Sequence, residues 1–363
     1  MASASRRALT PARIRRARPS RFIAIWIATA VLFAISPLLA PGSIDSSALL
    51  SMLPFAAILA IASIGQTLAV QQRGLDFSVG GMITVAAIIV TVYPHGSGGR
   101  LLPAIVLTLA VCALTGLASG LAITQLGITP LVATLGINAL LTGVALQITN
   151  GEPTAVATSG LASFALAKTV GIPNTVIIAA ALLCVVAVVM RTTVVGRRFI
   201  AIGAGRPATQ VAGLHVVRYE IGAYIAAAVA YGAAGILLAG YLERPDLTVG
   251  DNYLLPTVAA VVIGGTSLAG GRGSVVASAI GALFLTQLDQ VVQGMGAASS
   301  VQLVIQGGII AAGMALTQLP SLRLALRNGS GFTRLRSRLA KSTPRQPGRE
   351  PQSPEAGAGS RSE

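Results

Sequence analysis

Apolar residues occur in this chain as long runs that short polar segments interrupt at nearly regular intervals. A helix of about 20 apolar residues is long enough to cross the hydrocarbon core of a bilayer. Ten such runs follow one another, at residues 22–40, 49–70, 80–93, 102–124, 129–149, 173–190, 220–240, 254–269, 274–292 and 300–317. The pattern predicts an all-α polytopic membrane protein with about ten transmembrane helices, of which the third and eighth are short enough to be half-spans or tilted pieces.

Composition and charge indicate where the protein is located and how it is oriented in the membrane. Hydrophobic residues make up 53% of the 363 positions and charged residues 10%, so the bilayer is the expected solvent. Ten spans place both termini on one side, and of the 26 Lys and Arg residues all but Arg100, Lys168 and Arg244 fall on that side. Basic segments are retained in the cytoplasm, so we expect an N-in, C-in protein of the plasma (inner) membrane. The net charge of +15 then reflects topology and attraction to anionic membrane lipids, and no nucleic-acid partner is expected.

The same pattern divides the chain into three parts. Residues 1–21 form a basic cytoplasmic segment, residues 22–318 a transmembrane domain, and residues 319–363 a basic cytoplasmic tail. The first apolar run ends before Pro41, which is a poor context for signal-peptide cleavage, so we expect that run to be retained as a span. The tail is rich in Pro, Ser, Gly and Arg, a composition typical of disordered segments.

One polar segment stands between the second and third runs. Residues 71–87 read QQRGLDFSVGGMITVAA, where Arg73 and Asp76 occur beside three glycines. A carboxylate at membrane depth is costly unless it faces water or the interior of the bundle. The segment therefore predicts a broken helix in which Ser78 caps the helix that follows. An ordinary cytoplasmic turn with Asp76 as the helix cap is the alternative.

A fainter copy of this segment occurs later in the chain. The stretches 75–87 and 245–260 share four residue types at the same spacing: Asp76, Ser78, Val79 and Gly80 match Asp246, Thr248, Val249 and Gly250. The number of intervening spans places the first copy at a cytoplasmic end and the second in an outward connection. This arrangement is typical of an inverted repeat about a pseudo-two-fold axis in the membrane plane, which builds the central site of many transporters.

Two further stretches are informative. Residues 261–285 place six glycines and four small hydroxyl residues at the join of two spans, which predicts close helix packing with hydrogen bonds between Ser and Thr side chains.

Residues 191–220 form a long basic connection with a short amphipathic piece, in which Gly203, Gly205 and Gly213 are expected to act as breakers. The apolar positions at helical spacing are Ile200, Ala201, Ala204, Ala208, Val211 and Ala212. Such a helix can dock into a groove of a partner, and a solvated loop is the alternative.

The sequence contains no pattern typical of catalysis or metal binding. Lys168 and Lys341 are its two lysines and neither follows a glycine, so there is no Walker A motif, and any ATP must be hydrolysed by another chain. His95 and His215 stand without a second ligand at a metal spacing. We therefore expect no enzymatic activity, no metal and no cofactor.

Four blocks of the sequence resemble, in order, the inner-membrane permeases of sugar-importing ABC transporters, the ribose, xylose and autoinducer-2 permease family. The blocks are GQTLAVQQRGLDFSVGGMITVAA, ITPLVATLGINALLTGVALQITNG, VGRRFIAIGAGRPATQVAGLHV and AAVVIGGTSLAGGRGSVVASAIGALFL, and the similarity extends from about residue 45 to 318. Members of this family usually carry two glycines before the Asp of the first block, where this chain has Arg73 and Gly74.

The resemblance implies a permease subunit that forms the translocation pathway for a ribose- or xylose-like monosaccharide. It implies three protein partners, which are a cytoplasmic ABC ATPase, an extracytoplasmic sugar-binding protein, and a second permease subunit, either identical or a sister chain. It assigns ATPase coupling to Gly196, Arg197, Arg198, Ala201, Gly203, Ala212 and Gly213. Within its blocks the candidates for the substrate pathway are Asp76, Ser78, Thr134 and Asn138.

Other functions stay open at this point. The same architecture could carry nucleosides or branched-chain amino acids. An ion-coupled secondary transporter usually needs several ionisable groups within the membrane, and only Asp76 and Asp289 are candidates here. A membrane enzyme would need a catalytic constellation, which the sequence does not contain.

Overall fold

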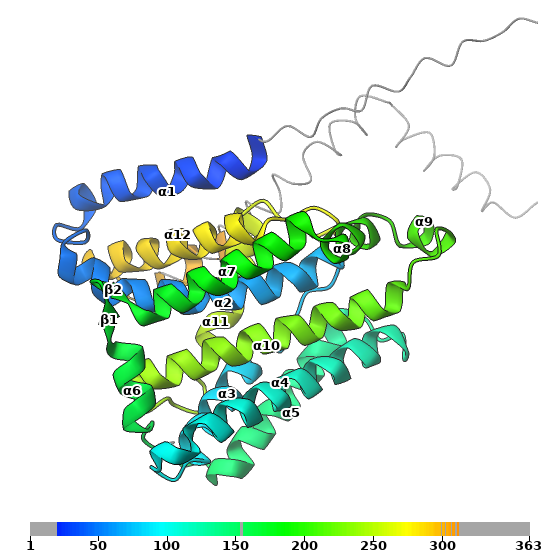
Figure 1. Cartoon of the computed structure of the whole chain (residues 1–363). Coiled ribbons are helices and arrows are strands. Elements are labelled where there is room, and N and C mark those ends of the chain that lie inside the picture. Colours follow the sequence, from blue (N-terminus) through cyan, green and yellow to red (C-terminus); the bar gives the residue numbers. More distant parts are fainter. Residues whose placement is uncertain are drawn as a thin grey trace, which may run out of the picture. The chain divides into compact units, whose positions relative to one another are not determined.

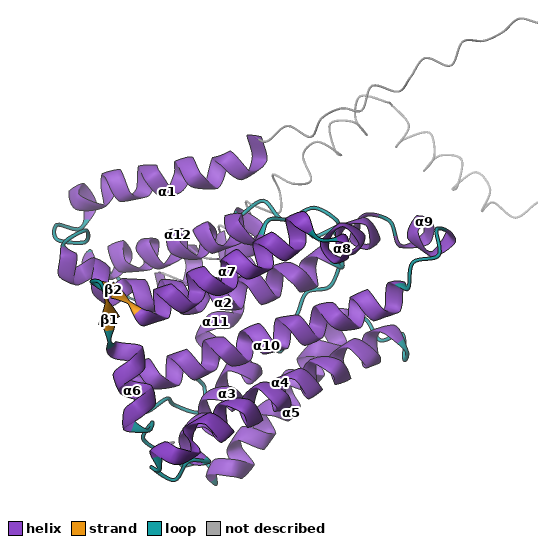
Figure 2. Cartoon of the chain, in the orientation of Figure 1, coloured by secondary structure: helices purple, strands orange, loops and turns teal. Residues whose placement is uncertain are grey.

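The computed structural model describes residues 20–152 and 155–298, together with residues 300, 301, 303–305, 307, 308 and 311. Figure 2 shows that nearly all of the described chain is helical, which confirms the predicted all-α fold. All but the last two residues of the predicted segment 1–21, the tail 319–363 and much of the last predicted span lie outside the described residues.

The other nine apolar runs all fold as helices (Figure 1). The long ones are α1 (Ser20–Leu39), α2 (Ser46–Gln71), α4 (Leu101–Thr124), α5 (Pro130–Thr149), α7 (Asn174–Thr192), α10 (Val216–Leu242) and α12 (Val275–Gly294). Among the described residues these seven helices are long and apolar enough to cross a membrane. The third and eighth runs form the short helices α3 (Val79–Val92) and α11 (Asp251–Ile263), as their lengths predict.

The helix α11 ends earlier than the sequence predicts. The eighth apolar run extends to residue 269, but the helix stops at Ile263 and Gly264 follows as its C-cap. Gly265 has a φ of +79°, a left-handed conformation that glycine adopts without steric cost and that ends helices. Residues 264–274 therefore form an irregular loop instead of a last helical turn.

Shorter elements that the apolar runs do not predict lie in the connections. The 3₁₀ turn η1 (Gly98–Arg100) precedes α4. The helix α6 (Ser159–Leu166) and the antiparallel strands β1 (Lys168–Thr169) and β2 (Ile172–Pro173) join α5 to α7, and the helices α8 (Val194–Ala204) and α9 (Arg206–Val211) join α7 to α10. In Figure 1, α6 and the strands lie at one end of the long helices, here called the strand end, and α8 and α9 lie at the other, the α8 end.

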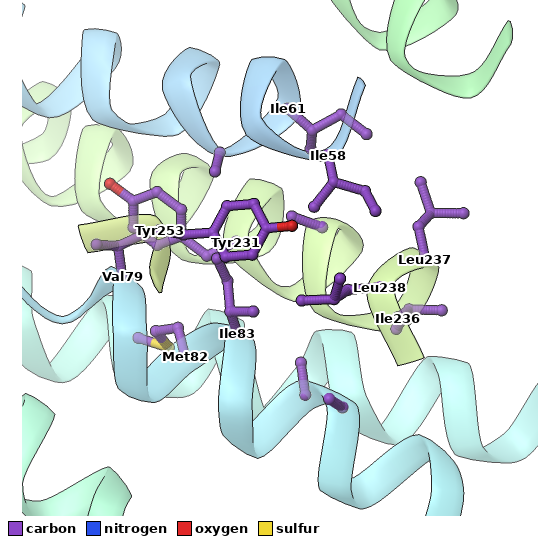
Figure 3. Packing of buried hydrophobic residues seen from close by; sticks show 14 of the residues in the cluster. Ile58, Ile61, Val79, Met82, Ile83, Tyr231, Ile236, Leu237, Leu238 and Tyr253 are labelled. Carbon is purple, nitrogen blue, oxygen red and sulfur yellow. The ribbon is translucent and has the colours of Figure 1, made fainter. Parts of the chain in front are cut away.

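The core lies where α2, α3 and α10 meet. Figure 3 shows Tyr231 of α10 between Ile58 and Ile61 of α2 and Ile83 of α3, and all four side chains are fully buried. The Tyr231 hydroxyl donates a hydrogen bond of 2.8 Å to the side-chain oxygen Oε1 of Gln66, so this buried hydroxyl has a partner within the core. The helices α2 and α10 consequently form the buried centre of the bundle.

The outer helices expose large apolar side chains, as a protein solvated by lipid must. Trp26 of α1, Leu102 of α4, Leu140 of α5 and Val185 of α7 are each at least half exposed. A soluble protein rarely exposes continuous apolar surface of this kind. The distribution of burial therefore agrees with a polytopic membrane protein.

The glycine-rich stretch 261–285 joins its helices closely, as predicted. The backbone of α12 at Gly281 contacts the carbonyl group of Ala260 in α11, so a side chain would not fit there. The Thr67 hydroxyl of α2 donates a hydrogen bond of 2.8 Å to the Ser278 hydroxyl of α12. Small residues permit this approach, and the hydroxyl pair stabilises it.

Candidate functional site

Asp76 lies in the connection between α2 and α3, at the α8 end of the bundle. Its side chain is 2% exposed. The carboxylate oxygen Oδ1 accepts hydrogen bonds from the Ser78 backbone N–H at 3.0 Å and from the Ser78 hydroxyl at 2.6 Å. The predicted capping of α3 by the Ser78 side chain is wrong, because that hydroxyl is engaged by Asp76. Burial raises the pKa of the Asp76 carboxyl, and the two hydrogen bonds from Ser78 oppose that rise.

The helix α5 holds the same connection from the other side. The Thr134 hydroxyl oxygen accepts a hydrogen bond of 3.0 Å from the backbone N–H of Phe77, and it donates to the carbonyl oxygen of Pro130 at 2.8 Å. One turn later, the Asn138 side-chain oxygen accepts a bond of 2.7 Å from the backbone N–H of Gly81. These two residues satisfy N–H groups at the start of α3 that have no partner within the helix.

The four sequence candidates for the pathway therefore come together. Asp76 and Ser78 form the turn before α3, and Thr134 and Asn138 fasten that turn to one face of α5. Their polar groups fix the backbone of a short, broken span. Among the described residues no group of three or more His, Cys, Asp or Glu could hold a metal ion.

The second copy of the motif folds in the same way. In the connection between α10 and α11, Asp246 Oδ1 accepts hydrogen bonds from the Thr248 backbone N–H at 2.8 Å and from the Thr248 hydroxyl at 3.1 Å. This turn follows the end of α10 at the strand end, whereas the Asp76 turn follows the end of α2 at the α8 end. The helices that follow then meet at the matching residues Gly80 and Gly250, whose backbones are in contact. These features support the predicted inverted repeat.

The helix α8 packs one face against the Asp76 connection. Phe199 and Ile202 are buried on this face, and the backbone oxygen of Phe199 accepts a hydrogen bond of 2.9 Å from the Gln72 side-chain nitrogen. The opposite face carries Arg197 and Ala201, which are exposed. The coupling candidates therefore divide into residues that hold α8 in place and residues that it presents outward.

Arg73 connects α8 to the turn before α3. Its Nε donates to the carbonyl oxygen of Gly203 at 2.9 Å, and its Nη2 donates to that of Ala204 at 2.9 Å. These are two of the final carbonyl groups of α8, which have no partner within the helix and which a cation stabilises. Arg73 has a φ of +68°, the left-handed conformation that glycine adopts readily. Sequence reasoning noted Arg73 beside Asp76 but missed this capping role.

The glycines of this segment have three different roles. Gly203 lies inside α8, and its backbone contacts the carbonyl oxygen of Gln71, so its predicted role as a breaker is wrong. Gly205 separates α8 from α9, which confirms its predicted role as a breaker. Gly213 has a φ of +78° and follows the end of α9, as a breaker does. Gly196 is buried against the last turn of α7, where the carbonyl oxygen of Met190 leaves no space for a side chain.

The remaining coupling candidates lie at the surface. Arg198, Ala212 and Gly213 are exposed, and the apolar side chain of Val211 is 91% exposed. The ion pair between Arg206 and Glu220, at 3.3 Å, ties the start of α9 to α10. An exposed apolar patch held on a short, braced helix is typical of a docking element.

Comparison with known proteins decides the family. Residues 48–314 match the family described as the branched-chain amino acid transport system / permease component. The chain belongs to this family. No solved structure matches it.

Three relatives illustrate the similarity. The ribose import permease protein RbsC of Escherichia coli (strain K12) is 32% identical over 292 residues, which cover 78% of this chain and 89% of that protein. RbsC of Bacillus subtilis (strain 168) is 32% identical over 282 residues, with coverages of 77% and 87%. The autoinducer 2 import system permease protein LsrC of Enterobacter sp. (strain 638) is 30% identical over 272 residues, with coverages of 75% and 79%. The chain is thus a multi-pass permease subunit of the plasma (inner) membrane and not an enzyme.

Proposed function

We propose that this permease forms the translocation pathway for a monosaccharide in a binding-protein-dependent ABC importer. The similarity to ribose import permeases over more than three-quarters of the chain carries the proposal. A relative that imports autoinducer 2 extends the likeness to another small import substrate. These relatives favour a sugar over a branched-chain amino acid or a nucleoside, although the family description names the amino acids.

In this importer the α8 end faces the cytoplasm. The basic residues of the connections at that end are Arg73, Arg191, Arg197, Arg198, Arg206, Arg218 and Arg272, whereas the strand end has Arg100, Lys168 and Arg244. The excess of positive charge supports this orientation.

The helices α8 and α9 dock onto a separate ATPase. The exposed residues Arg197, Arg198, Ala201, Val211 and Ala212 form the docking face. The buried face of α8 rests on the connection between α2 and α3, so movement of the ATPase is passed to the segment that holds Asp76. Closing of the ATPase pair would in this way switch the pathway between inward-facing and outward-facing states.

The other partners are an extracytoplasmic sugar-binding protein and a second permease subunit. The binding protein supplies affinity and selectivity, so the permease needs only weak contacts with the sugar. Asp76, Ser78, Thr134 and Asn138 set the geometry of the pathway at its cytoplasmic end.

Substrate competition tests this function. The permease, its ATPase and its binding protein are reconstituted in proteoliposomes, and uptake of radiolabelled D-ribose is measured in the presence of unlabelled D-xylose, L-leucine or adenosine. We expect uptake of ribose, its inhibition by xylose, and no effect of leucine or adenosine. Inhibition of ribose uptake by leucine or adenosine but not by xylose, or no uptake of ribose at all, would refute the proposed substrate class.

A further inference from the structure

A cavity of about 680 Å³ lies between α2, α10, α11 and α12 at the strand end of the bundle. This volume is within the range of about 300–1,000 Å³ that is typical of small-molecule sites. The residues of the Asp76 turn do not line the cavity, although the start of α11, which does, contacts Gly80 of α3. Three features of the wall indicate which ligand it fits.

The first feature is a polar stripe on α12. Thr286, Asp289, Gln290 and Gln293 follow one another at helical spacing, and all four line the cavity. The stripe lies within a helix that is apolar enough to span a membrane. Polar side chains inside a span are costly and usually mark a substrate pathway.

The second feature is an aromatic pair on α2 and α10. The rings of Phe55 and Tyr241 meet edge to face, with centroids 5.0 Å apart and planes at 78°. The Tyr241 hydroxyl donates to the backbone oxygen of Ser51 at 3.4 Å, which helps to hold the ring in place. Rigid aromatic rings offer apolar surface to the C–H faces of a sugar ring, while the polar stripe can bind its hydroxyl groups.

The third feature is the charge of the wall. Asp246 and Asp289 both line the cavity, whereas no Lys or Arg of the described residues does. The two hydrogen bonds that Thr248 donates to Asp246 both use Oδ1, so Oδ2 is available to a ligand. Carboxylates accept hydrogen bonds from neutral hydroxyl groups. This wall therefore suits a sugar.

We propose that this cavity binds the transported monosaccharide, with the α12 stripe and Asp246 on the hydroxyl groups and the Phe55–Tyr241 pair against the ring. The inference rests on the proposed function and assigns the sugar an entry site at the extracytoplasmic end. Sugar delivered by the binding protein is held here before the pathway opens toward the Asp76 turn.

Protection of a single thiol tests the proposal directly. Ser51 is exposed on the cavity wall, Cys184 is exposed elsewhere, and Cys112 is buried. A Ser51→Cys variant that also carries Cys184→Ser therefore has one reactive thiol in the cavity. We expect concentrated D-ribose to slow its labelling by a hydrophilic maleimide severalfold in the purified permease–ATPase complex. The matched control is Ser97→Cys with Cys184→Ser, because Ser97 is exposed in a connection at the same end outside the cavity. Equal effects of ribose at both thiols, or at neither, would overturn the proposal.

Transport kinetics give an independent reading. Gln293→Leu removes one hydrogen-bonding side chain from the stripe, and we expect the maximal rate of ribose uptake to fall severalfold while retention of the ATPase is unchanged. Tyr241→Phe keeps the ring, so its maximal rate should change much less. If the wild-type importer transports ribose and Gln293→Leu has the wild-type maximal rate, the cavity assignment is wrong and the proposed function stands. If the wild-type importer transports no sugar, the proposed function is wrong, and so is the assignment of a sugar to the cavity.

Discussion

The guanidinium nitrogen Nε of Arg73 donates a hydrogen bond of 2.9 Å to the carbonyl oxygen of Gly203, which lies in the last turn of α8. This bond joins the proposed ATPase-docking helix to the connection that contains Asp76. Gly271 strengthens the same junction, because its N–H donates to the carbonyl oxygen of Gln71 at 2.9 Å. Three segments that are far apart in sequence therefore move together at the α8 end.

Replacing Arg73 separates its two roles. Arg73→Gly removes the guanidinium and also relieves the strain of a side chain at a φ of +68°, about 1–2 kcal/mol, whereas Arg73→Ala removes the guanidinium and keeps that strain. We expect the ratio of sugar uptake to ATP hydrolysis to fall severalfold in both variants. The Tm should fall clearly only in Arg73→Ala. A wild-type ratio of uptake to ATP hydrolysis in Arg73→Gly would show that the guanidinium has no part in coupling ATP hydrolysis to uptake.

The close contact at Gly203 predicts a sharp difference between two neighbouring glycines. Gly203→Ala places a methyl group against the carbonyl oxygen of Gln71 and should destabilise the permease by about 1–3 kcal/mol. Gly205→Ala is the matched control, because its added methyl group has ordinary space and its φ of −163° suits any residue. Thermal unfolding of the two purified variants decides the point, and equal Tm values would contradict the packing described here.

The docking face predicts variants that fold but do not couple. Ala201 and Ala212 are exposed, so Ala201→Glu or Ala212→Glu should leave a folded, inserted permease that neither retains its ATPase in detergent nor supports uptake. Arg197→Ala should be milder, because Arg197 is exposed and an exposed charged contact contributes about 0–1 kcal/mol. Co-purification of the ATPase is quantified beside uptake. Full retention of the ATPase by both Glu variants would show that the docking surface lies elsewhere.

The turn before α3 predicts two further results. Asp76→Leu should abolish most uptake without preventing membrane insertion, because it removes the acceptor that orders Ser78. Normal uptake by this variant would show that Asp76 is not part of the pathway.

Thr134→Val removes the partner of the Phe77 N–H, and leaving this group unpaired should cost about 1–3 kcal/mol of stability. Thr142→Val on the same helix is its control, because the exposed Thr142 hydroxyl bonds only within α5, to the Asn138 carbonyl oxygen. Unfolding in detergent compares the two, and equal stabilities would mean that Thr134 does not hold the turn.

The long helices could be predicted because length and apolarity alone determine which runs can span a bilayer. The clustering of Asp76, Ser78, Thr134 and Asn138 was expected from the family blocks, and the structure brings them together at one turn. The breaks at Gly205 and Gly213 were predicted, but the continuation of α8 through Gly203 could not be, because glycines at 203, 205 and 213 look alike in sequence and differ only in their tertiary contacts. The capping role of Arg73 was missed for the same reason, since its partners are 130 and 131 residues away.

The most direct test of the account is the energy source of sugar uptake in proteoliposomes that contain the permease, its ATPase and its binding protein. The account predicts accumulation of labelled sugar only when ATP is on the side of α8 and the binding protein is on the opposite side. Ala201→Glu should abolish this accumulation. Accumulation driven by a proton or sodium gradient without ATP, and unaffected by Ala201→Glu, would contradict it.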